Sequence, residues 1–161
     1  MKNKIFFIFA ICLFSFLSSG YNPNQNKPKD GVLIHLSSSY DNPHKVLMAL
    51  SLALKMSENK NVLVFMDIQG VKIAVKNAED IRIENFDSLN NLLNKLIENK
   101  VELMVCPMCL KQAGFKPEDL KEGFKLADKE RFFDFTEGRI LTLNYWYKKQ
   151  ASSLLLYFEY Q

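Results

Sequence analysis

The amino-acid sequence predicts an α/β protein, a single three-layer domain in which a mostly parallel sheet of about five strands lies between helices. The first observation is a series of strand-length apolar runs without polar alternation, which is typical of strands covered on both faces. The second is that amphipathic helical segments separate these runs. The third is the composition of one globular domain, since 48% of the 161 residues are hydrophobic and 24% are charged.

The first 20 residues predict a cleaved secretory signal. Lys2 and Lys4 precede an apolar run at residues 5–17, and the small residues 18–20 follow it. A membrane anchor is the alternative, but a spanning helix needs about 20 apolar residues. We therefore expect a periplasmic protein without a membrane span after cleavage. Its expected parts are a signal peptide at residues 1–20, a linker at 21–30 and one folded domain at 31–161.

The net charge argues against a nucleic-acid partner. Without the two lysines of the signal, 19 basic residues remain against 18 acidic ones, so the net charge is about +1. The lysines are scattered along the chain and form no basic cluster. Nucleic-acid binding needs such a cluster, so we expect no nucleic-acid partner.

The first half of the folded domain predicts two strands around a helix. Residues 31–36 and 61–67 are short apolar runs bounded by turn-forming residues, and each predicts a buried strand. Between them, Asn42 suits an N-cap and Pro43 suits the first helical position, so a helix is expected from Pro43 to about Ser57.

The middle of the domain is less regular. Residues 70–84 show no clear period and predict mixed structure. Asp87 or Ser88 can cap a second helix, whose leucines at 89, 92, 93 and 96 share one face. Residues 101–105 are a third apolar run and predict a strand that leads directly into Cys106.

The last third predicts a short helix at residues 107–113, which Gly114 ends, and a fourth strand at 139–144. Residues 154–158 predict either a fifth strand or a tail that packs on a partner. The aromatic residues between 145 and 160 fit either the core or a subunit interface.

The chemistry of the chain centres on Cys106 and Cys109, because the third cysteine, Cys12, lies in the signal. They follow the third predicted strand, at the sheet edge where open α/β folds bind ligands. A thiol at a helix N-terminus is expected to have a lowered pKa, so Cys106 is expected to be the more reactive thiol. Cys109, one turn later, can resolve a mixed disulfide or persulfide, or close a disulfide with Cys106.

Other interpretations of this CxxC motif remain open. In an exported protein the two cysteines can form a structural disulfide, although so short a loop removes little entropy from the unfolded chain. A structural zinc site needs four ligands, which His35 and His44 would have to complete. Copper(I) favours sulfur ligands, and Met104 extends the motif to M-x-C-x-x-C, but Met104 lies within a predicted strand.

Two further groups lie near the same edge. His35, at the end of the first strand, either faces the Cys106 edge and stabilises a thiolate or is a satisfied core histidine. Residues 37–39 are three serines that either offer donors to an anion or simply form a loop.

These elements and the cysteine motif together resemble the DsrE/DsrF-like family, which includes the sulfur-relay subunits DsrE and TusD. The similar segments are Val32-Leu-Ile-His-Leu-Ser, Lys45-Val-Leu-Met-Ala-Leu, Gly70-Val71 and Val105-Cys106-Pro-Met-Cys109-Leu-Lys-Gln-Ala-Gly114. The resemblance implies a three-layer, flavodoxin- or Rossmann-like fold and assembly into trimers or hexamers. It also implies that Cys106, eight residues before Gly114, corresponds to the cysteine that carries sulfur as a persulfide.

This sequence differs from the relay subunits in its second cysteine, Cys109, and in its predicted export. We therefore expect a periplasmic sulfur-binding or sulfur-relay protein that uses Cys106 and Cys109, forms a homo-oligomer and meets a sulfur donor or acceptor protein. The alternatives are an oligomeric binding module with a structural disulfide, or a copper or zinc binder. No acid/base dyad, phosphate loop or cofactor fingerprint is visible, so the sequence predicts no cofactor and leaves enzymatic turnover open.

Overall fold

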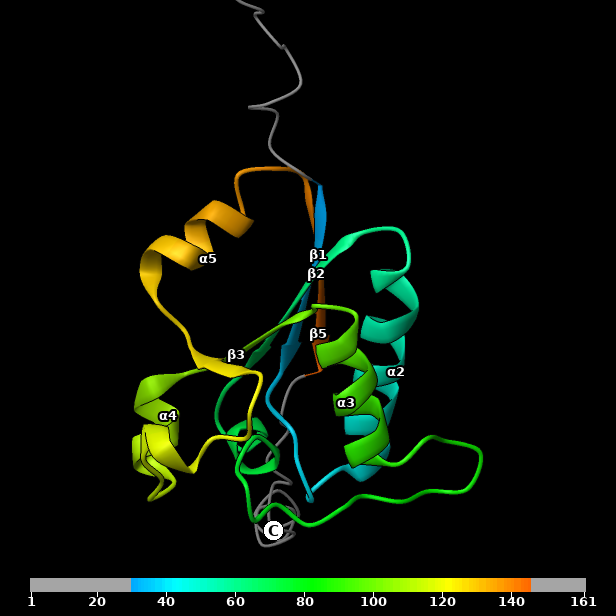
Figure 1. Ribbon diagram of the computed structural model, residues 1–161, viewed down its shortest axis with the longest axis vertical. Helices are drawn as coiled ribbons and strands as arrows, with labels where there is room; N and C mark the ends of the chain where they lie inside the picture. The colour runs from blue at the N-terminus through cyan, green and yellow to red at the C-terminus, as the bar shows by residue number, and fades with distance from the viewer. Residues whose placement is uncertain (1–29, 146–161) are drawn as a thin grey trace, which may run out of the picture.

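The structure, a computed structural model, describes residues 30–145 as a five-stranded parallel sheet with helices on both faces (Figure 1). The strand order is β4-β3-β2-β1-β5, and each neighbouring pair is parallel. The strands are β1 (Gly31–Leu36), β2 (Asn61–Met66), β3 (Glu102–Val105), β4 (Phe124–Leu126) and β5 (Ile140–Tyr145). The predicted α/β class and parallel sheet are confirmed.

The helices connect these strands in the expected alternation. They are α2 (Pro43–Ser57), α3 (Leu89–Glu98), α4 (Pro107–Gln112) and α5 (Lys129–Phe135), with two short 3-10 turns, η1 (Gly70–Ile73) and η2 (Pro117–Asp119). The predicted cap of α2 is confirmed, since the Asn42 side chain accepts a hydrogen bond from the backbone N–H of Lys45. Ser88 caps α3, where the sequence left Asp87 and Ser88 open.

The main core lies on one face of the sheet. Figure 1 shows α2 and α3 together on this side, and the buried leucines of α3 are the four predicted from its spacing. Side chains at alternate strand positions, such as Ile34 and Val64, join the same cluster. The opposite face carries a smaller cluster, in which Phe135 of α5 packs with Leu63 and Met104.

Two elements were missed by the sequence analysis, namely β4 and α5. The predicted fourth strand at 139–144 is therefore β5, the fifth strand in chain order. Residues 154–158, predicted as a possible fifth strand, lie outside the described residues, as do the predicted signal, most of the linker and the C-terminal aromatic residues after Tyr145. β4 escaped prediction because it is three residues long and depends on pairing with β3.

The mixed segment at 70–84 begins as η1 and is otherwise irregular, apart from a single bridge between Val75 and Leu120. Its first residue, Gly70, packs directly on the end of β1, because a Cβ at this position would overlap the carbonyl oxygen of Leu36. The backbone N–H of Gln69 also donates to the carbonyl oxygen of Ser37 at 3.2 Å. These contacts hold the loop after β2 against the end of β1.

Among residues 30–145, none of the helices combines the length and the hydropathy needed to cross a bilayer.

Candidate functional site: the cysteine pair and its pocket

The cysteine pair lies where the sequence placed it, at the carboxyl end of β3. Cys106 directly follows this strand and is the N-cap residue of α4, while Cys109 lies in the helix. The backbone N–H of Cys106 donates to the carbonyl oxygen of Met66 at 2.9 Å, which continues the pairing of β3 with β2. Both cysteines are half-buried and free of a disulfide.

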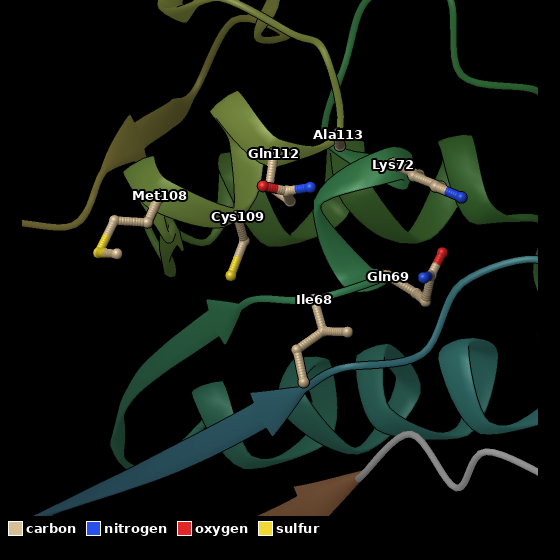
Figure 2. A pocket seen from close by; sticks show the side chains of 7 residues that line it. All are labelled: Ile68, Gln69, Lys72, Met108, Cys109, Gln112 and Ala113. Carbon is tan, nitrogen blue, oxygen red and sulfur yellow. The ribbon is translucent and has the colours of Figure 1, made fainter.

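A pocket of about 680 Å³ opens beside this pair, between α4 and the segment that follows β2 (Figure 2). Its lining residues are Ile68, Gln69, Lys72, Met108, Cys109, Gln112 and Ala113. In Figure 2 the sulfur of Cys109 points from α4 toward Ile68 across the pocket. Cys106 is absent from this lining, so Cys109 is the cysteine that the pocket exposes.

The environment of Cys109 favours the protonated thiol. Burial raises its pKa above the ordinary value of 9.0, and a hydrogen bond with the side chain of Cys106, the charge of Cys106 and, least of all, the charge of Asp67 act in the same direction. A backbone hydrogen bond from Ile68 opposes these effects. The S–H of Cys109 is therefore available as a donor to the sulfur of Cys106.

A polar network extends from this site across the carboxyl ends of β2, β1 and β5. His35 Nε2 lies 2.8 Å from Asp67 Oδ2, and the hydroxyl of Ser37 donates to Asp67 Oδ1 at 2.5 Å. Ser37 Oγ is also 3.2 Å from His35 Nε2, and His35 Nδ1 is 3.2 Å from Asn144 Oδ1. The ring of His35 stacks on Phe65 with a centroid distance of 5.7 Å. Four side chains from three strand ends are thus held in one arrangement.

Backbone strain is found in the same place. Ile68, which follows Asp67 and lines the pocket, has a φ of 44°, which a β-branched residue rarely adopts. Its side chain is 38% exposed, so core packing alone does not explain this conformation. Residues held in such conformations cluster at functional sites. The strain therefore marks this loop as part of the site.

The structure sorts the residues singled out by the sequence. His35 does lie at the edge that carries Cys106, as one of its two interpretations predicted, and its hydrogen-bond partners there include Asp67, Ser37 and Asn144. The serines at 37–39 are buried, with the Ser37 and Ser39 hydroxyls bonded to Asp67 and Asp41. The Ser38 hydroxyl is buried without a hydrogen-bond partner among the described residues.

Asp67 is a site residue that the sequence analysis did not single out, as are Asn144 and the pocket residues Ile68, Gln69 and Lys72. It lies at the end of the run predicted as the second strand, so its position at the carboxyl end of a strand was the available signal. One carboxylate after a strand is too common a pattern to single out. Its importance follows from the side chains that other strands bring to it.

The metal interpretations find little support in the described part of the chain. Within residues 30–145, no group of three or more histidine, cysteine or acidic side chains could hold a metal ion. Met104 is 1% exposed inside β3 and packs in the smaller core cluster. His44 packs edge-on against Phe86, with ring centroids 5.3 Å apart.

Comparison with known proteins identifies the family. The model of the DsrE/DsrF-like family matches residues 31–141, which include β1 to β4 and the first two residues of β5. The chain belongs to the DsrE/DsrF-like family.

A curated relative of this DsrE/DsrF-like chain is the uncharacterized protein MJ0760 of Methanocaldococcus jannaschii, 26% identical over 93 residues. The match covers 57% of this chain but only 33% of that protein, so the chain spans about a third of its relative's length.

Two solved structures share the fold. The ychN protein from E. coli has a TM-score of 0.58 at 17% identity, with 71% of this chain and 99% of that chain covered. A protein of unknown function from Methanobacterium thermoautotrophicum, MTH1491, has a TM-score of 0.55 at 18% identity, with 72% and 98% covered. At these identities the likeness shows the fold, which agrees with the family assignment.

Proposed function

We propose that this protein is an exported sulfur carrier of the DsrE/DsrF-like family that holds sulfane sulfur as a persulfide on Cys106. The observation that carries the proposal is the cysteine pair at the carboxyl end of β3, where Cys106 caps α4 and Cys109, in the first turn of the helix, lines an open pocket. Family membership supports a sulfur-relay role. The position of Cys106 before Gly114 supports the choice of the carrier residue.

The transfer step needs no cofactor. The thiolate of Cys106 attacks the outer sulfur of a donor persulfide, R–S–SH, and forms a new S–S bond. The bond between that sulfur and R–S breaks, and the R–S⁻ leaving group takes up a proton. The S–H of Cys109 can then donate to the new terminal sulfur, because its raised pKa keeps it protonated near neutral pH.

The test is the intact mass of the protein, alkylated without reduction, before and after incubation with sodium polysulfide. We expect a gain of about 32 Da per sulfur atom that reductant reverses. The Cys106→Ser variant should show no gain, while Cys109→Ser, the matched control in the same motif, should still take up sulfur. Equal uptake by wild type and Cys106→Ser would refute the proposal.

A structural disulfide is the second candidate, and the contact between the two cysteine sulfurs favours it. It predicts a mass about two daltons below that of the dithiol, no alkylation and no response to polysulfide. It also predicts that replacing both cysteines by serine leaves assembly unchanged.

Export and assembly belong to the same proposal. Export predicts that protein from the periplasm lacks residues 1–20, which N-terminal sequencing would show. The family resemblance supports a trimer or hexamer, and the exposed Leu141 on the edge strand β5 offers apolar surface for contacts between copies. Light scattering after size exclusion measures the assembly, and a monomer at micromolar concentration would contradict it.

A further inference from the structure

A persulfide on Cys106 lies close to the thiol of Cys109, which can react with it and release its outer sulfur. If Cys109 ionises, its thiolate can attack Sγ of Cys106 and displace the sulfane sulfur as HS⁻, leaving a Cys106–Cys109 disulfide. The sulfane sulfur is reduced and the two cysteine sulfurs are oxidised, so no further oxidant is required. The persulfide proton stays on the departing sulfur. A carrier with this motif therefore has to restrain Cys109.

Asp67 is the charged group that the fold places next to the pair. It follows β2, and the carbonyl of the preceding residue, Met66, accepts the backbone N–H of Cys106. The residue after it, Ile68, contributes the backbone hydrogen bond to Cys109. Asp67 is thus one residue from a contact with each cysteine, since Met66 is bonded to Cys106 and Ile68 lines the same pocket as Cys109. Its negative charge adds a small effect to the raised pKa of the Cys109 thiol.

The carboxylate of Asp67 is fixed in this place. One oxygen is bound by His35 Nε2 at 2.8 Å and the other by the Ser37 hydroxyl at 2.5 Å. The Asp67 side chain is only 17% exposed, so water screens its charge less than that of a surface carboxylate. The strained backbone of Ile68 connects this fixed group to the pocket.

We propose that Asp67, fixed by His35 and Ser37, keeps Cys109 from displacing the sulfane sulfur held on Cys106, so that the motif stores sulfur instead of closing into a disulfide. This inference rests on the proposed function. Asp67 is a positioning residue, since it acts through Cys109. Burial already disfavours a thiolate at Cys109, and the nearby carboxylate adds the cost of a second negative charge.

The first experiment measures persulfide lifetime. The full chain is loaded with sodium polysulfide, freed of excess, and followed by intact mass and sulfide release. Asp67→Asn should lose its persulfide about threefold faster than wild type and accumulate the Cys106–Cys109 disulfide, because the neutral amide no longer opposes the thiolate. Adding Cys109→Ser to Asp67→Asn should restore the lifetime.

Two matched controls separate charge from shape. Asp67→Glu retains the carboxylate and should keep the persulfide close to the wild-type lifetime. Asp134→Asn removes an exposed carboxylate from α5 and should have no effect. The inference is overturned if Asp67→Asn holds its persulfide as long as wild type, or if Asp67→Glu loses it as fast as Asp67→Asn.

A second experiment needs no sulfur loading. In a Cys106→Ser background, the rate at which iodoacetamide alkylates Cys109 should rise about threefold on Asp67→Asn. If wild type takes up no sulfur, the proposed function fails, yet this rate still decides whether Asp67 restrains Cys109, and equal rates overturn the inference. Circular dichroism verifies folding, and Asp67→Ser replaces Asp67→Asn if the latter is unfolded.

Discussion

Charged side chains lie at both the carboxyl ends and the amino ends of the strands, here called the carboxyl edge and the amino edge, but they are buried to different extents. At the carboxyl edge, His35 and Asp67 are 16% and 17% exposed and bind each other together with Ser37. At the amino edge, Arg139 pairs with Asp30, and the Arg139 side chain is 91% exposed. Exposed ion pairs contribute little to stability, because water and salt screen them. Half-buried polar groups contribute more to stability, because removing one partner leaves the other desolvated and without a hydrogen bond.

The two edges differ in how tightly their residues are held in place. The carboxyl edge combines a polar network, the strained backbone of Ile68 and the close contact of Gly70 with Leu36. The amino edge shows surface pairs of the kind formed by Arg131 and Glu102. Open α/β sheets bind their ligands at the carboxyl edge. Substitutions at this edge should therefore lower the free energy of unfolding more than substitutions at the amino edge.

The largest effect is expected for Gly70→Ala. Its new Cβ would overlap the carbonyl oxygen of Leu36, which is backbone and cannot turn away, so the free energy of unfolding should fall by about 3 kcal/mol. Gly114→Ala is the control, because its φ is positive but no atom lies within 4 Å of the added Cβ. It should cost about 1 kcal/mol. Urea denaturation measures both, and equal losses would mean that the contact with Leu36 is unimportant.

The next effect compares the charged pairs of the two edges. Asp67→Ala removes the carboxylate that His35 and Ser37 both bind, and should lower the free energy of unfolding by about 2 kcal/mol. Arg139→Ala at the amino edge should hardly move the urea midpoint. The comparison breaks down if Arg139→Ala is the more destabilising of the two.

A smaller change in the free energy of unfolding is expected when glycine replaces either of two residues with a left-handed backbone, Lys100 and Ile68. Lys100, after α3, has a φ of 58° in a Schellman motif, with Val101 N–H donating to the carbonyl oxygen of Leu96 at 2.9 Å. Lys100→Gly should therefore raise the free energy of unfolding by about 1 kcal/mol and leave sulfur uptake unchanged.

Ile68→Gly relieves similar strain but loosens the loop that hydrogen-bonds Cys109. Its gain in stability should be smaller than that of Lys100→Gly, because the isoleucine side chain is also lost, and sulfur uptake should slow. Urea midpoints and the rate of mass gain with polysulfide test both variants. Unchanged uptake in Ile68→Gly would show that the strain serves no function.

The smallest effect is the response of the amino edge to acid. The hydrogen bond from Arg139 lowers the pKa of Asp30 below 3.8, so the stabilising contribution is present above that value and is lost as the pH falls through the folded pKa. Asp30→Asn should therefore flatten the decline of stability as the pH falls below about 4. An unchanged slope would mean that the pair contributes nothing to stability.

Part of the site could be predicted from the sequence and part could not. The cysteine pair was located correctly, because an apolar run, a proline and Gly114 together define a strand followed by a short helix. The polar network beside the pair was predicted only in part: the sequence singled out His35 but not its bond with Asn144, because these residues, 109 positions apart, meet only when β1 and β5 pair in register. The contact of His35 with the Asp67 carboxylate likewise forms only when β1 and β2 lie side by side.

The helices and strands also divide into those that local sequence determines and those that depend on tertiary structure. The sequence by itself determined β1, α2, β2, α3, β3, α4 and β5, because continuous apolar runs, capping residues and helical spacing act within a few residues. Only the tertiary structure decided β4 and α5. Three strand residues and seven helical ones carry too weak a local signal, and the burial of Phe124 and Phe135 exists only once the rest of the sheet is present. The polar network follows the same rule, since side chains from separate strands become neighbours only through long-range pairing.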